Sequence, residues 1–149
     1  MQEPEQDSIR LAMDQAWRDH HHARDQTWRA VQIEAVLAAG VVGVDFQLEN
    51  VGATIAAGIL VIIAAIFGIM ISLHHRKLEI RKFTHIMNCE AALGLHQPDL
   101  IDNVSLPSPI TFWDIFRFRK MNTALFILRM HFAIIAFAVI FVVVRIFFS

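Results

Sequence analysis

The sequence predicts an all-α membrane protein with three transmembrane helices, on three observations. Hydrophobic residues make up 56% of the 149 residues, above the roughly 45–50% that is usual in soluble proteins. This excess is concentrated in three blocks, at residues 30–48, 51–73 and 124–148. The middle block carries no charge and, at about 1.5 Å per residue, is long enough to cross a hydrocarbon core of about 30 Å.

The two outer blocks are interrupted by ionisable residues. Residues 30–48 contain Glu34 and Asp45, which makes this block the weakest of the three candidate spans. Residues 124–148 contain Arg129, His131 and Arg145. We still expect both to span, because the remainder of each block is apolar.

Small residues recur at four-residue spacing in the first two blocks, and this spacing lets helix backbones approach closely in lipid. The series are Ala35/Ala39/Gly43, Gly52/Ala56 and Ala64/Gly68. We therefore expect the first two spans to pack as a hairpin across a short turn at Glu49 and Asn50.

The remaining segments are expected to be helical and to lie outside the bilayer. Residues 1–29 predict an N-terminal amphipathic helix, and Trp28 falls where a helix meets the lipid headgroups. The pattern after residue 73 predicts that the second span continues as an amphipathic helix and ends near Gly94 to Pro98. Residues 100–109 predict a loop, and residues 111–120, with Trp113, a short interfacial helix. The predicted segments are 1–29, 30–73, 74–123 and 124–149.

Basic residues set the predicted topology. A cluster follows the second span, at Arg76, Lys77, Arg81 and Lys82, whereas the turn between the first two spans has no lysine or arginine. The positive-inside rule places the N-terminus and residues 74–123 in the cytoplasm. We expect a multi-pass protein of the bacterial inner (plasma) membrane. The cluster is also suited to an anionic lipid or ligand, although positive-inside retention alone would produce it.

Ionisable residues inside a span cost about 2.5–3.5 kcal/mol each on insertion scales, so they usually face protein or water. Glu34 and Arg129 lie at similar depth, which predicts an ion pair between helices. Glu34 and Asp45 are eleven positions apart and share a face, which is suited to lining a cation pore. The third interpretation is that these groups snorkel to the membrane surfaces.

Cofactor and enzyme signatures are weak. The eight histidines lack metal-ligand spacing, and no two lie at matched depth on two spans as membrane haem requires, so we expect no metal or cofactor. Cys89 is the single cysteine, which excludes an intrachain disulfide. No phosphate-binding loop or nucleophile elbow is present, and we expect neither an enzyme nor direct nucleic-acid binding.

Two segments resemble small bacterial membrane effectors of anti-phage defence, including the SLATT-type family and effectors associated with nucleotide signalling. The first is the tryptophan-bearing helix from Trp17 to Trp28 that runs into the hairpin, and the second is the basic helix from Arg81 to Leu95. The resemblance covers residues 17–95, and the third span departs from a two-span layout. It implies a homo-oligomer that disrupts the membrane or conducts ions when a nucleotide ligand, or a nucleotide-making or nuclease partner, signals.

The leading hypothesis is therefore an oligomeric inner-membrane effector that forms an ion-conducting pore. The alternative is a non-conducting membrane anchor or assembly subunit whose cytoplasmic helices dock a partner. A haem-binding respiratory subunit is a third and weaker hypothesis.

Overall fold

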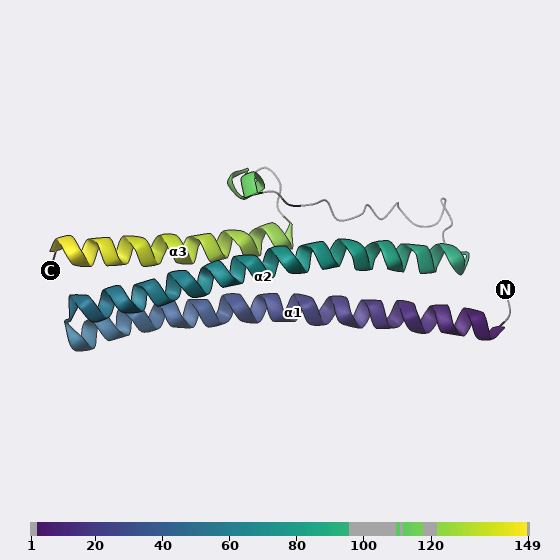
Figure 1. Cartoon of the computed structure of the whole chain (residues 1–149), viewed down its shortest axis with the longest axis horizontal. Coiled ribbons are helices and arrows are strands. Elements are labelled where there is room, and N and C mark those ends of the chain that lie inside the picture. The colour runs from purple at the N-terminus through teal and green to yellow at the C-terminus, as the bar shows by residue number, and fades with distance from the viewer. Residues whose placement is uncertain (1–2, 96–109, 111, 118–121, 149) are drawn as a thin grey trace. The chain divides into compact units, whose positions relative to one another are not determined.

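The computed structural model describes residues 3–95, 110, 112–117 and 122–148, and within these ranges every regular element is helical. The elements are α1 (Glu3–Leu48), α2 (Val51–Ala92), the 3₁₀ helix η1 (Phe112–Phe116) and α3 (Thr123–Phe148) (Figure 1). The three α-helices are each long and apolar enough to cross a membrane. The predictions of an all-helical chain and of three candidate spans are confirmed.

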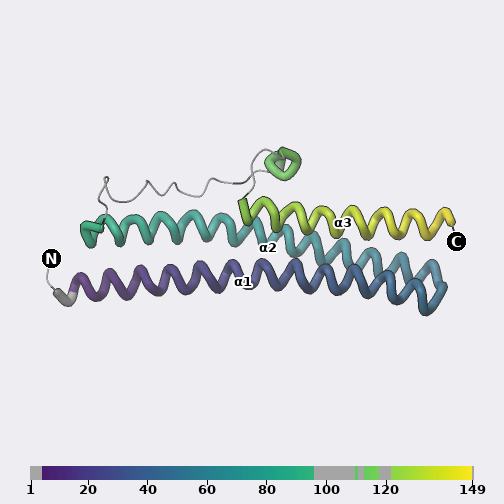
Figure 2. The backbone as a smooth tube through the Cα atoms, turned by 180° about the vertical axis from the view of Figure 1, so that it is seen from behind, coloured from purple at the N-terminus to yellow at the C-terminus, as the bar shows by residue number. Residues whose placement is uncertain are grey.

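α1 is one continuous helix that comprises both the predicted N-terminal segment and the first candidate span (Figure 2). Between Pro4 and Gly40 the sequence contains neither proline nor glycine, so nothing interrupts the backbone hydrogen bonds at residue 29. The change at that point is one of composition only.

The turn between α1 and α2 comprises Glu49 and Asn50, as predicted. Glu49 adopts a left-handed conformation, with φ of 47°. The Asn50 side-chain oxygen accepts a hydrogen bond from the Ala53 N–H (3.1 Å) and caps α2. Two residues therefore suffice to reverse the chain.

Local caps define the end of α2 and the start of α3. Gly94 has φ of 68°, and the Leu95 N–H donates to the Glu90 carbonyl (2.9 Å), which is the hydrogen bond of a Schellman motif. The predicted end near Gly94 is confirmed. At the start of α3, the Asn122 side-chain oxygen accepts from the Leu125 N–H (2.8 Å).

Part of the predicted connection between α2 and α3 lies outside the described residues. This applies to the loop at 100–109 and to residues 118–120 of the interfacial helix. The described part of that helix is the single 3₁₀ segment η1.

The chain divides into two compact units, to which α1 and α2 both contribute. Unit 1 comprises Met1–Asp25 and His74–Ile110. Unit 2 comprises Gln26–Leu73 and Thr111–Ser149, and it contains the three apolar blocks of the sequence.

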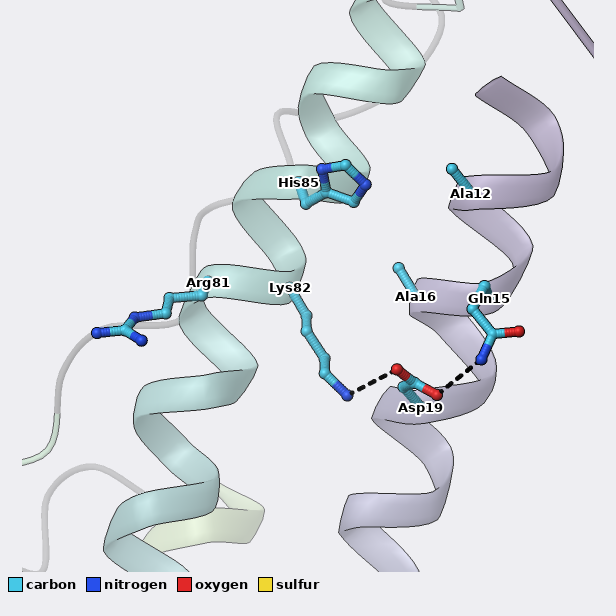
Figure 3. A pocket seen from close by; sticks show the side chains of 7 residues that line it. All are labelled: Ala12, Gln15, Ala16, Asp19, Arg81, Lys82 and His85. Atoms are coloured by element: carbon cyan, nitrogen blue, oxygen red, sulfur yellow. Dashed lines mark hydrogen bonds and ion pairs between the residues drawn. The ribbon is translucent and has the colours of Figure 1, made fainter. Parts of the chain in front are cut away.

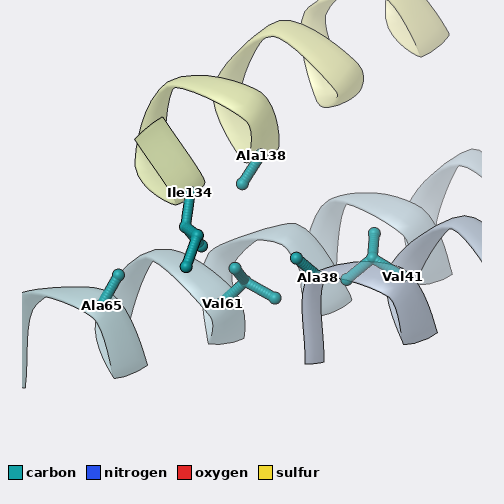
Figure 4. Close-up of a cluster of buried hydrophobic side chains, with 6 residues drawn as sticks. All are labelled: Ala38, Val41, Val61, Ala65, Ile134 and Ala138. Atoms are coloured by element: carbon teal, nitrogen blue, oxygen red, sulfur yellow. The ribbon is translucent and has the colours of Figure 1, made fainter. Parts of the chain in front are cut away.

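Small residues on one face of α2 form the packing surface of unit 2. Val61 and Ala65 are 1% and 0% exposed and pack with Ala38 and Val41 of α1 and with two residues of α3 (Figure 4). A Cβ atom on Gly58 would collide with the Val142 side chain. The buried α2 residues recur at steps of three and four, as in a left-handed helical bundle. Within unit 2 they are Thr54, Gly58, Val61, Ala65, Gly68 and Ser72.

The small-residue series of α1 faces the other way. Ala35, Ala39 and Gly43 are all exposed, and a Cβ atom on Gly43 would meet nothing within 4 Å. The close approach of helices in unit 2 is therefore made by α2.

The packing predicts different tolerances at two alanines of α2. Ala65→Leu should lower the free energy of unfolding by about 1–3 kcal/mol, because a larger side chain overpacks a fully buried site. Ala56→Leu is the control, since Ala56 is exposed on the same helix. The measurement is the unfolding of the purified protein in detergent, followed by circular dichroism. Equal effects of the two substitutions would contradict the packing.

Candidate functional site: two polar layers in unit 2

The first polar layer joins all three long helices of unit 2. Glu34 on α1 and His131 on α3 are 3% and 0% exposed. The His131 Nδ1–H donates to Glu34 Oε2 (2.6 Å). On the other side of the ring, His131 Nε2 lies 3.0 Å from the Ser72 hydroxyl of α2. Both ring nitrogens therefore have partners within the chain.

Gly68 makes this layer sterically possible. A Cβ atom at this position would overlap Glu34 Oε1 and would lie 2.6 Å from His131 Cε1. Any side chain on residue 68 would therefore displace the carboxylate and the imidazole. The glycine is required here for close approach of the side chains and not for its backbone conformation.

The second polar layer lies at the other end of unit 2, near the turn between α1 and α2. Asp45 Oδ1 on α1 accepts from the Thr54 hydroxyl (2.6 Å) and from Arg145 Nε (2.8 Å). The Asp45 and Arg145 side chains are 15% and 26% exposed, so this layer is less buried than the first. The shared face predicted for Glu34 and Asp45 is thus the face of α1 that meets α3.

An apolar layer separates the two polar layers. Its residues are those of Figure 4, and each lies between the two layers along its own helix. Eleven positions on α1 correspond to about 16 Å along the helix axis. The core of a single chain is therefore polar near both ends and filled by alkyl side chains between them.

The predicted ion pair between Glu34 and Arg129 is wrong. Arg129 Nε donates to the Ile115 carbonyl (3.0 Å) and its Nη2 to the Arg117 carbonyl (2.8 Å). The Arg129 side chain instead reaches η1 and the residue after it. His131, two positions later, meets Glu34 instead.

One imidazole connects side chains from three helices in this layer. With Nδ1–H donating to Glu34, Nε2 accepts from the Ser72 hydroxyl if Nε2 carries no proton, and donates to the Ser72 oxygen if it carries one. In both cases the His131 ring links α1, α2 and α3.

The hydrogen-bonded chain of carboxylate, imidazole and hydroxyl also resembles a hydrolase triad. Ser72, however, lies within the continuous helix α2, whose N–H groups are committed to carbonyls four residues earlier. The surrounding helix thus supplies no free N–H pair for an oxyanion. Ser72 is also only 8% exposed. The chemistry of the layer fits a hydrogen-bonded clamp better than a nucleophile.

Metal binding has no evident site in the described ranges. They contain no group of three His, Cys, Asp or Glu side chains that could hold an ion. His131, the one histidine in the sequence of unit 2, uses both ring nitrogens for Glu34 and Ser72.

The two tryptophans predicted at the interface differ in environment. Trp28 is partly buried, with its ring 6.1 Å from that of Phe126. Trp113, in η1, is 71% exposed. The predicted headgroup contacts of both remain predictions.

The predicted basic cluster lies in unit 1. Two of its four residues contact carboxylates and the other two are exposed. Arg76 bonds to Glu79, and Lys82 Nζ lies 3.4 Å from Asp19 Oδ2. Lys77 and Arg81 are exposed. Figure 3 shows Lys82 pointing to Asp19 across a groove of about 410 Å³, with Arg81 pointing away. Only Lys77 and Arg81 are thus placed to meet an external anion.

Sequence reasoning missed His131, Ser72 and Thr54. A usable signal was present, because His131 and Arg145 are fourteen positions apart and so lie on one face of α3. Arg129 is sixteen positions from Arg145 and lies on nearly the opposite face. Two buried partners for Glu34 and Asp45 must share a face, which selects His131.

The chain matches no family model, no curated protein and no solved structure. The resemblance to anti-phage membrane effectors therefore stays a prediction.

A double-mutant cycle can distinguish the observed from the predicted pairing. Glu34→Gln combined with His131→Asn should show a coupling free energy of about 0.5–2 kcal/mol, the range for hydrogen bonds between membrane helices. Glu34→Gln combined with Arg129→Gln is the control and should show coupling near zero. The measurement is unfolding of the purified protein in mixed micelles. Strong coupling in the control cycle alone would overturn the assigned layer.

Proposed function

We propose that the chain is a membrane effector that assembles as a homo-oligomer and opens a path for ions, with α3 holding the resting state closed. The observation that supports it is the pair of intramembrane carboxylates, Glu34 and Asp45, both facing α3. A helix that served only as an anchor would have no use for them, because each costs about 2.5–3.5 kcal/mol to insert.

The two layers suggest how such a path would open. While His131 and Arg145 hold the carboxylates, the apolar layer keeps the core of each chain dry. Displacement of α3 would expose both carboxylates on one stripe of α1. In an oligomer, such a stripe would form two rings of negative charge, which is the arrangement that favours cations in pores.

The signal and setting follow from the resemblance alone. We propose that gating is exerted by a partner protein or a nucleotide ligand, in anti-phage defence. Exposed Lys77 and Arg81 are suited to meeting an anionic ligand or lipid headgroup.

In the proposed orientation, the N-terminus and the amphipathic extension of residues 74–123 lie on the cytoplasmic side of the bacterial inner membrane. A cysteine introduced at Glu49, in a Cys89→Ala background, should react with an impermeant maleimide added outside intact spheroplasts. The control is a cysteine introduced at Lys77 in the same background, which should react with the maleimide only after lysis. The opposite pattern would reverse the topology.

Ion flux from liposomes tests the proposed mechanism. His131→Ala and Arg145→Ala should each raise resting cation flux, by about 2- to 30-fold if about 0.5–2 kcal/mol of closed-state stabilisation is lost. Adding Glu34→Gln and Asp45→Asn should remove the increase and the preference for cations. Arg129→Ala is the matched control, since it bonds to carbonyls in this structure.

The alternative is a non-conducting anchor that docks a cytoplasmic partner through unit 1. The observation that favours it is that each carboxylate already has a partner within the chain. Absence of flux in every variant, with function preserved after replacement of all three spans, would support the anchor and end the pore proposal.

A further inference from the structure

A packed aromatic cluster joins α1 and α2 within unit 1. The ring of His20 on α1 lies 5.0 Å from that of Phe83 on α2, and the Trp17 ring lies 5.5 Å from Phe83. The His20 side chain is only 11% exposed. An imidazole is therefore part of the apolar contact between the two helices.

The charges around His20 do not favour a further positive charge. His20 Nδ1 lies 4.0 Å from Glu79 Oε1, but Glu79 is also bonded to Arg76. Burial is the main cause that lowers the pKa of His20 from its usual value of about 6.5, and Glu79 opposes the shift. The remaining charged neighbours lower it further. They are His21, Arg24 and Lys82.

His75 lies in the same interface on the α2 side. Burial is again the main cause that lowers its pKa, against a hydrogen bond with the backbone of Ala23 that acts in the opposite direction. His74 and Lys82 add to the lowering. One histidine from each helix thus lies in the same helix–helix contact, and burial lowers the pKa of both.

We propose that unit 1 is an acid-operated latch, in which uptake of protons by His20 and His75 separates α1 from α2 along this contact. Separation returns both imidazoles to water, where a positive charge costs little.

The sign of the pH dependence follows from linkage. Between the lowered pKa values and about 6.5, the open form binds more protons than the closed form, so the stability of the closed form rises with pH. The contribution of the two histidines to the closed form is therefore greatest above about pH 6.5 and is lost as the pH falls below it. Each proton changes the closed-to-open ratio by at most about tenfold per pH unit, and two protons by about 100-fold.

The experiment measures the distance between α1 and α2 in the full-length protein in lipid nanodiscs. Spin labels are placed at Leu11→Cys and Asn88→Cys in a Cys89→Ala background, because both labelled positions are exposed and uncharged. We expect a single short distance at pH 8 and a second, longer one that grows below about pH 6.5. A distance distribution unchanged from pH 8 to pH 5 would overturn the latch.

Variants separate proton uptake at the two histidines from general acid effects. His20→Gln/His75→Gln should stay closed across the range, and His20→Gln alone should reduce the steepness to at most about tenfold per pH unit. His22→Gln is the control, since His22 is exposed on α1 and is not among the groups that shift the pKa of His20 or His75, and it should respond like the parent. An unchanged response in the double variant would overturn the assignment. Helicity at pH 8, and Trp17 fluorescence with Trp28 and Trp113 replaced by Phe, verify folding.

This inference does not rest on ion conduction. Loss of the pH response with conduction intact would reject the latch alone, and absence of conduction with the pH response intact would reject the pore alone.

Discussion

Three helices that face hydrocarbon outside and one another inside have nowhere to place an unpaired charge. In unit 2 this constraint is met because each carboxylate of α1 contacts a nitrogen atom of an α3 side chain. Each carboxylate is also linked to a hydroxyl of α2, directly for Asp45 and through the imidazole ring for Glu34. Glu34 reaches Ser72 through His131, and Asp45 contacts both Thr54 and Arg145. The register of the helices, the glycine at position 68 and the small residues of α2 all serve these two contacts.

The elements could be predicted from the sequence where one local signal was decisive. The uncharged block at 51–73 identified the central span. Glu49 and Asn50 identified the turn between α1 and α2, and Gly94 marked the end of α2. The boundary predicted at residue 29 is one of composition and not of backbone, because without proline or glycine the helix continues across it.

The site was harder to predict because depth in a membrane and direction around a helix are independent coordinates. Depth alone paired Glu34 with Arg129, whereas direction points to His131, on the same face of α3 as Arg145. The role of Gly68 could not be derived from the sequence, since it depends on how closely Glu34 and His131 pack over it. The two units also use histidine differently, as a fully engaged partner at His131 and as a member of an aromatic cluster at His20.

The partners of both carboxylates lie on α3, the last helix of the described chain, and this has a consequence for biosynthesis. A ribosome completes α1 and α2 before α3 exists, so the hairpin enters the translocon with neither His131 nor Arg145 available. Asp45 can use the Thr54 hydroxyl of the hairpin in the meantime, whereas the His131 partner of Glu34 comes only with α3. The order of synthesis thus leaves Glu34 as the last of the two carboxylates to gain any partner seen in the structure.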